Sequence, residues 1–218
     1  MENNEVNPES QEEIAEKKAQ RFELLSGVTL AFFAAVLAVT DLGGGKYGDD
    51  EIIGTNEKSN MYQWFQSKSV KQSLVEGQRD LLQSLIDSKA IEKKYSASIT
   101  VYIKKLNEEI DRYKKEKKEL MLGSATVGKD NWMQEVDGEK GKIIGAKEWE
   151  KKVEILGKAG DVFDLAVLWL QLCLVIGAIS LVLKNPKLKW IFYGLMVGGG
   201  GIGIFFSVRA FLIAFSAG

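Results

Sequence analysis

The chain has 218 residues, a net charge of −1 and 27% charged residues, values that are ordinary for a soluble domain. The charges are unevenly placed, however, since most lie between residues 43 and 160 and three other segments contain long uncharged runs. There is no histidine and one cysteine, Cys173, which argues against most hydrolase triads, catalytic zinc sites and disulfide frameworks. We therefore expect no enzyme, no cofactor, no metal site and no nucleic-acid partner.

The N-terminal region is predicted to be a polar tail, residues 1–22, followed by a first transmembrane helix, residues 23–42. Its uncharged run, Leu24 to Thr40, approaches the roughly 20 residues that cross about 30 Å of hydrocarbon. The run could also be the core of a secretory signal. The tail is rich in glutamate, whereas the leading region of a signal is short and basic, so an uncleaved anchor is favoured.

Residues 43–56 are rich in glycine and predict a flexible linker that leaves the membrane. Residues 57–122 then predict two helical stretches. The first, Glu57 to Ile86, has one broad apolar face. The second carries a heptad seam, interrupted only by Lys117, with these apolar positions: Ile99, Ile103, Leu106, Ile110, Tyr113 and Leu120.

These two stretches are similar in length, about 30 residues each, and the chain must return to the membrane near Asp161. Both facts favour an antiparallel coiled-coil hairpin with its tip between Asp87 and Tyr95. Because neither glycine nor proline marks the tip, one continuous helix from Glu57 to Leu122 stays open as the alternative.

A motif at the start of this region combines aromatic and basic residues, from Tyr62 to Gln72. Placed after one span and before a charged helical pair and a two-span hairpin, it resembles a bacterial membrane-protein family catalogued as domain of unknown function 4337. Ser67 and Val70 depart from the family pattern. The resemblance implies an integral membrane protein of three helices with an external helical hairpin, and it implies no activity. The matching residues are Trp64, Phe65, Gln66, Lys68, Ser69, Lys71 and Gln72.

Two interpretations of this motif remain. Six of its residues could bind phosphate headgroups, a cell-wall polymer or a partner chain, since lysines and aromatics on adjacent turns combine charge with stacking. Alternatively, the aromatic residues pack the base of the hairpin and the lysines face solvent. The six candidate interaction residues are Trp64, Phe65, Gln66, Lys68, Lys71 and Gln72.

The C-terminal half predicts a glycine-rich loop at residues 123–145, a helix at 146–184 that runs into the second span, and a third span at 188–218. The predicted fold class is an all-α membrane protein with three transmembrane helices and an extramembrane antiparallel coiled-coil helical hairpin between the first two spans. Basic residues precede the first span and fill the turn between the other two. The positive-inside rule then predicts a bacterial inner-membrane protein with a cytoplasmic N-terminus and a periplasmic hairpin, although lysines also flank the second span from the hairpin side.

Three polar residues are predicted within or beside the last two spans. If the chain reverses about Asn185 and Pro186, Asp164 and Arg209 lie at equal depth and could pair; otherwise the arginine reaches the headgroups and the aspartate caps a helix. Gln171 lies on nearly the same face as Asp164. Together these residues could line a water-filled route, or the glutamine could bridge two helices.

Small residues recur at four-residue spacing in the first and third spans, a pattern that lets membrane helices approach closely. We expect them to serve helix packing or oligomerisation, within one subunit or between subunits. The predicted function is an integral membrane scaffold or interaction protein that self-assembles in the bilayer, with an unidentified membrane or cell-envelope protein as partner. The alternative is a small oligomeric channel or transport subunit. The candidate packing residues are Gly27, Ala31, Ala35, Gly194, Gly198, Gly199 and Gly203.

Overall fold

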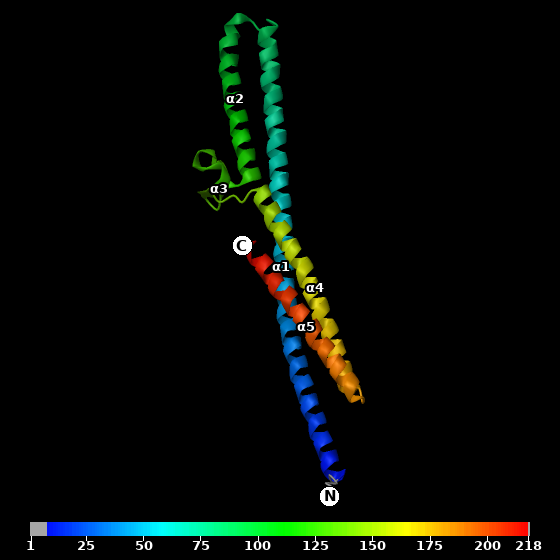
Figure 1. Ribbon diagram of the computed structural model, residues 1–218. Coiled ribbons are helices and arrows are strands. Elements are labelled where there is room, and N and C mark those ends of the chain that lie inside the picture. The colour runs from blue at the N-terminus through cyan, green and yellow to red at the C-terminus, as the bar shows by residue number, and fades with distance from the viewer. Residues whose placement is uncertain (1–7, 218) are drawn as a thin grey trace. The chain divides into compact units, whose positions relative to one another are not determined.

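The computed structural model describes residues 8–217, which are helical almost throughout (Figure 1). Within these described residues three helices are long and apolar enough to cross a membrane, so the predicted all-α class with three membrane-length helices is confirmed. Between α2 and α4 the chain forms short elements, including a two-stranded antiparallel ribbon. The elements are α1 (Pro8–Asp87), α2 (Lys93–Leu122), α3 (Ser124–Val127), the 3-10 turn η1 (Lys129–Asn131), β1 (Glu135–Val136), β2 (Glu139–Lys140), α4 (Ala146–Val182) and α5 (Pro186–Phe215).

Helix α1 is 80 residues long and includes two of the predicted segments. Residues 1–7 of the predicted polar tail lie outside the described residues, and the rest of the tail is helix from Pro8 onward. The flexible linker predicted at residues 43–56 is wrong, because α1 passes through it without a break. Glycine is a weak helix former, but Gly43 and Gly44 pack on the ring of Phe163, and tertiary packing of this kind outweighs propensity.

The charged region is divided into two helices. Because α1 ends at Asp87 and α2 begins at Lys93, the alternative of a single helix from Glu57 to Leu122 is wrong. Lys89 adopts a positive φ of 57° within the intervening turn. The left-handed conformation there ends the helix without the glycine that usually occupies such a position.

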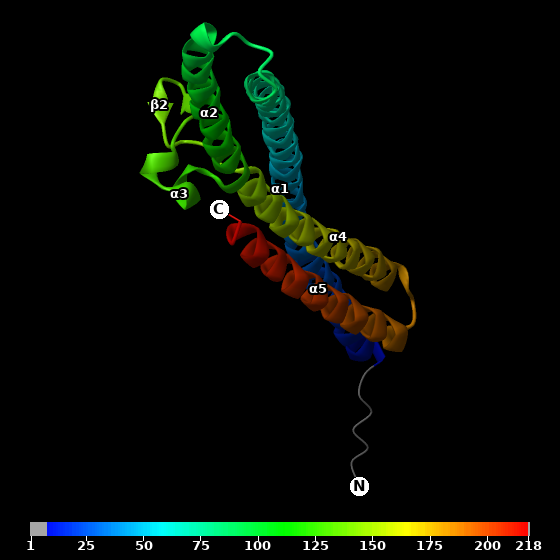
Figure 2. The ribbon, with the colours of Figure 1, turned by 90° about the horizontal axis from the view of Figure 1, so that it is seen from above.

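The chain forms two compact units. The first contains residues 1–49 and 155–218, and thus the N-terminal part of α1, most of α4 and all of α5. Its central cluster joins the three helices through Phe33, Leu170, Cys173 and Met196. Helices α4 and α5 run side by side along this unit (Figure 2).

The second unit contains residues 50–154. In it Val75 of α1 packs with Leu106, Ile110 and Tyr113 of α2, which are predicted seam residues. Near the end of the seam the heptad places Lys117 at the inward position, but Glu116 is the buried residue and Lys117 is half-buried. An α-helix has 3.6 residues per turn, so a strict heptad drifts round its surface and Glu116 takes the inward place.

The glycine-rich loop at residues 123–145 is an ordered module built around one carboxylate. Glu119 is fully buried at the end of α2, where it accepts hydrogen bonds of 2.8 Å from Ser124 Oγ and from the backbone N–H groups of Met133 and Gln134. Ser124 Oγ in turn accepts from the N–H of Ile143 at 3.0 Å. These bonds hold both ends of the loop, since a buried donor without a partner is costly.

Candidate functional site

Glycines on α4 and α5 give the first unit its close helix contacts. A Cβ atom at Gly203 would lie 2.7 Å from Cγ of Leu170, and one at Gly200 would collide with the ring of Phe33. Gly177 receives the side chain of Met196 in the same way. A chain reversal at Asn185 and Pro186 predicts that residues equally distant from this point lie opposite each other on α4 and α5. The contacts of Gly203 with Leu170 and of Gly177 with Met196 follow this register.

The predicted packing glycines of α5 lie on two different faces. Gly203 faces the unit interior, and Gly199 lies 3.5 Å, measured from its ideal Cβ position, from Cβ of Cys173. In contrast, Gly194 and Gly198 have no side chain near them and are exposed. They line an apolar groove of about 340 Å³ between α4 and α5, together with Trp169, Leu172, Cys173, Ile176, Leu195, Gly199 and Ile202.

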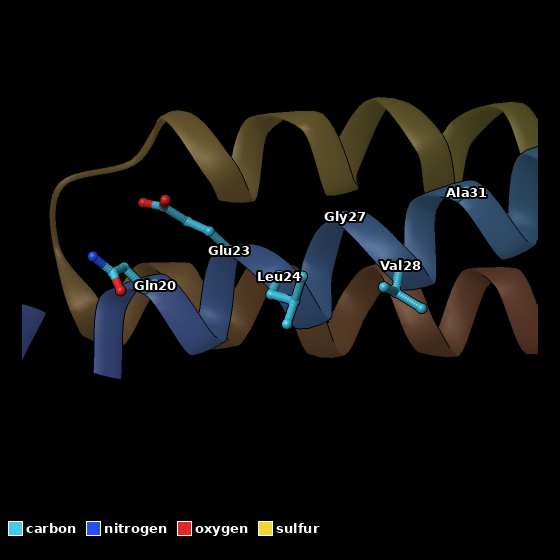
Figure 3. A pocket seen from close by; sticks show the side chains of 6 residues that line it. All are labelled: Gln20, Glu23, Leu24, Gly27, Val28 and Ala31. Carbon is cyan, nitrogen blue, oxygen red and sulfur yellow. The ribbon is translucent and has the colours of Figure 1, made fainter. Parts of the chain in front are cut away.

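The predicted small residues of the first span are all exposed on α1. Gly27 and Ala31 line a shallow hollow of about 550 Å³, with Leu24 and Val28 beside them (Figure 3). Ala35 lines a separate hollow of about 250 Å³. The inward face of this span is formed instead by Phe22, Ser26, Phe33 and Thr40, which are all buried.

The predicted intramembrane polar residues do not enter the interior of the first unit, and two of them, Asp164 and Gln171, share one face of α4. Asp164, Gln171 and Arg209 are all exposed on the first unit, and the structure gives no ion pair between Asp164 and Arg209. Helices α4 and α5 are rotated about their axes so that the neighbouring residues Phe163 and Ala210 point inward in place of Asp164 and Arg209. Each polar side chain therefore faces whatever surrounds the unit.

Two polar contacts that the sequence reasoning missed join α1 to α5. Thr40 Oγ1 and Ser207 Oγ lie 2.8 Å apart and are buried, and Thr29 Oγ1 lies 3.2 Å from the hydroxyl of Tyr193. Hydroxyl groups inside apolar spans were the available signal, since such groups require hydrogen-bond partners away from water.

The motif at residues 62–72 is divided between contact and exposure. Lys68 Nζ lies 2.7 Å from Glu116 Oε2, with both side chains largely covered. Phe65 is half-buried beneath Lys117, whose Nζ is 5.3 Å from the ring centroid. Trp64 is half-buried as well, and Gln72 donates to Glu76 Oε1 at 2.8 Å. Only Gln66 and Lys71, among the six candidate interaction residues, are exposed.

No metal-binding group emerges from the geometry: the described residues contain no cluster of three or more cysteine, aspartate or glutamate side chains that could hold an ion. Among the described residues the candidate site is therefore a set of surfaces. The first unit offers the groove lined by Gly194 and Gly198 and the small-residue face of α1. The second offers the exposed part of the motif.

Comparison with known proteins identifies a family for this chain. Residues 22–213 match the sequence model of a family described as "Domain of unknown function (DUF4337)". Comparisons with curated proteins and with solved structures found no significant match. The matched range extends from the first predicted span almost to the end of α5, and the chain therefore belongs to the family of domain of unknown function 4337.

Proposed function

We propose that this chain is a bacterial inner-membrane protein with three transmembrane helices, supplied by α1, α4 and α5. In this proposal the N-terminus and the turn between α4 and α5 lie in the cytoplasm, and residues 50–154 lie in the periplasm. Lys189 Nζ is 3.8 Å from Glu23 Oε1, so the start of the first span and the turn between α4 and α5 lie at the same end of the unit. This supports two crossings between these points, by α1 and α4, to which α5 adds a third. The basic residues around them support the cytoplasmic assignment of that end.

The proposal extends to an antiparallel coiled-coil hairpin formed by the last part of α1 with α2. Its support lies in the order of the contacts. Lys68 pairs with Glu116 and Arg79 with Asn107, so partner numbers fall along α2 as they rise along α1. Successive partners of this kind are expected of two helices that run in opposite directions.

The function we propose is that of a scaffold that self-assembles in the membrane. The observation that carries it is the open groove at Gly194 and Gly198, where two glycines one turn apart lie on an apolar surface with no side chain of the same subunit over them. Small residues at this spacing allow the backbone of a second helix to come close, and dispersion contacts then drive association in lipid. We infer that a second copy of the chain occupies this groove. The second copy would insert the face of its α1 helix that carries Gly27, Ala31 and Ala35.

This proposal is tested by filling the groove. The full chain is purified in a neutral detergent, and its subunit number is measured by native mass spectrometry. Gly198→Leu should convert the assembly to monomers, since leucine occupies the space that the neighbouring helix requires. Ala178→Leu introduces the same side chain at an exposed position of α4 outside the groove and should leave the subunit number unchanged. A wild-type monomer at all accessible concentrations, or an assembly insensitive to Gly198→Leu, would contradict the proposal.

A small oligomeric channel or transport subunit is the second candidate. The observation that favours it is the exposure of Asp164 and Gln171 on one face of α4. Polar groups at membrane depth tend to face a protein neighbour or a water-filled path. Ion flux in liposomes that Gln171→Leu abolishes, while the subunit number stays the same, would select the channel. An assembly that gives no flux would select the scaffold.

The partner that such a scaffold holds is proposed to be another membrane or cell-envelope protein, contacted through the exposed motif residues Gln66 and Lys71. Co-purification from native membranes, compared between the wild type and Lys71→Ala, tests this contact. The proposal assigns the chain no catalytic activity.

A further inference from the structure

A further cavity lies in the first unit, between the N-terminal part of α1 and the start of α5. It has a volume of about 360 Å³, and its walls include Lys18 and Phe22 of α1, Lys184 of the turn, and Lys189 and Trp190 of α5. The sequence places these three lysines in two separate clusters, one before the first span and one between the second and third spans. The fold places them around one space.

The cavity has an excess of positive charge. Lys189 has an acidic neighbour, Glu23, at 3.8 Å, whereas Lys18 and Lys184 form no ion pair with any residue that the structure describes. Pro186, which also lines the cavity, is the first residue of α5, a helix of 30 residues. The N-terminal end of a helix carries a partial positive charge, so it adds to the potential of the lysines.

The other wall of the cavity is aromatic. The ring centroids of Phe22 and Trp190 are 5.1 Å apart, and those of Trp190 and Tyr193 are 5.6 Å apart. Tryptophan and tyrosine gather where hydrocarbon meets headgroups, so this cluster marks the level of the membrane surface. The lysines therefore lie at headgroup depth, and apolar side chains lie directly beneath them.

We propose that this cavity binds the phosphate of an anionic phospholipid headgroup. The phosphate lies among Lys18, Lys184 and Lys189, and the acyl chains follow the apolar surface beside Trp190. A basic pocket between membrane helices on the cytoplasmic side has the chemistry for such a ligand, because point charges satisfy the phosphate while the aromatic wall contacts the lipid glycerol and chains. This inference rests on the proposed insertion of the three helices in the bilayer.

The test uses the full chain in neutral detergent, with phosphatidylglycerol or phosphatidylcholine added at equal molar ratio. Native mass spectrometry measures the lipid retained as mass increments. The wild type should retain phosphatidylglycerol in preference to phosphatidylcholine. Lys18→Gln and Lys184→Gln should each weaken retention about fivefold, as expected when one lysine at a membrane surface is lost.

Lys187→Gln is the matched control, because Lys187 is exposed at the start of α5, three residues after Lys184, but does not line the cavity. It should retain the lipid as the wild type does, and so should Lys184→Arg, which keeps the charge. Full retention by the double variant Lys18→Gln/Lys184→Gln, or an equal loss in Lys187→Gln, would overturn the site. Displacement of the lipid by inorganic phosphate at equal concentration would show a soluble-anion site and would overturn the lipid assignment.

The same spectra separate this inference from the proposed scaffold. Total mass gives the subunit number, and the increments give the lipid. A monomer with lysine-dependent lipid would contradict self-assembly and leave the lipid site standing. An assembly whose lipid retention does not depend on the lysines would contradict the lipid site and leave self-assembly standing.

Discussion

At the scale of single residues, two neighbouring glycines of α5 have opposite surroundings. Gly200 lies against the ring of Phe33, while Gly201 has open space where a Cβ atom would be. The two positions share the same helix and the same composition around them. Any difference between their alanine variants therefore reports packing against α1.

We expect Gly200→Ala to lower the midpoint of thermal unfolding in detergent. The added methyl group would overlap Phe33, and overpacking a tight contact costs about 1–3 kcal/mol. Gly201→Ala should leave the midpoint unchanged or raise it slightly, since alanine is the better helix former. Equal midpoints for the two variants would mean that α5 does not pack on Phe33.

Glu119 is the second residue whose role follows from its contacts. Glu119→Ala would leave the buried donors Ser124 Oγ and Gln134 N–H, and the part-buried N–H of Met133, without their acceptor. Each unpaired buried donor costs about 1–3 kcal/mol, so residues 123–145 should lose order while the helices remain. Limited proteolysis should then cut within this module.

The control for that experiment is Glu108→Ala, which removes an exposed glutamate of the same helix. Its proteolysis pattern should match that of the wild type. If Glu119→Ala also gave the wild-type pattern, the carboxylate would not be what orders the loop.

At the scale of elements, the unbroken course of α1 through residues 43–56 is the main departure from expectation. Hydrogen exchange can measure it directly, because amide groups of a helix exchange slowly and those of a glycine-rich linker exchange at once. We expect protected amides from Tyr47 to Asn56. Gly48→Ala should increase their protection, since nothing lies within 4 Å of its ideal Cβ position and alanine favours helix by about 1 kcal/mol. Fast exchange across this stretch would contradict the continuous helix and support the flexible linker that the sequence predicts.

The contact between α1 and α2 depends on the pair Lys68 and Glu116, whose side chains are 17% and 9% exposed. Without Lys68, the covered Glu116 carboxylate keeps only the more exposed Arg112, whose Nε lies 3.5 Å from Glu116 Oε1, so part of its charge compensation is lost. We expect Lys68→Ala to destabilise the second unit by about 2–3 kcal/mol, measured by urea unfolding of the full chain in detergent. The effect should be small for Lys71→Ala, the exposed lysine of the same motif.

A different result would change the meaning of the motif. If Lys68→Ala had no effect on unfolding but abolished binding of a co-purified partner, the lysine would be a binding residue. If Lys71→Ala alone affected the partner, the motif would combine both interpretations, with Lys68 for packing and Lys71 for contact.

At the scale of the whole molecule, the proposed topology places residues 187 and 137 on opposite sides of the membrane. Single cysteines at these positions, Lys187→Cys and Asp137→Cys in a Cys173→Ser background, can be labelled in intact spheroplasts with a thiol reagent that does not cross membranes. Both native residues are exposed, so burial does not limit the reaction. We expect label at position 137 alone. Label at position 187 alone would reverse the orientation, and label at both would contradict three crossings.

The sequence by itself determined the features that depend on local composition and period. Three uncharged runs predicted the three membrane-length helices, and the heptad of α2 predicted the residues that meet Val75. It also placed the family resemblance at the motif between Trp64 and Gln72, and the match over residues 22–213 bears that out. These features follow from properties that each segment has without its neighbours.

Only the tertiary structure decided which face of each helix is covered. Spacing alone treats Gly198 and Gly203 as equivalent, yet Leu170 fills the space over Gly203 and nothing fills the space over Gly198. Spacing likewise sets Asp164 opposite Arg209, whereas in the structure Phe163 and Ala210 form the buried contact between α4 and α5. The gathering of Lys18 with Lys184 around one cavity has the same origin. The rotation of a helix about its axis is determined by the side chains of the helices packed against it, and a single sequence carries that information only through the fold.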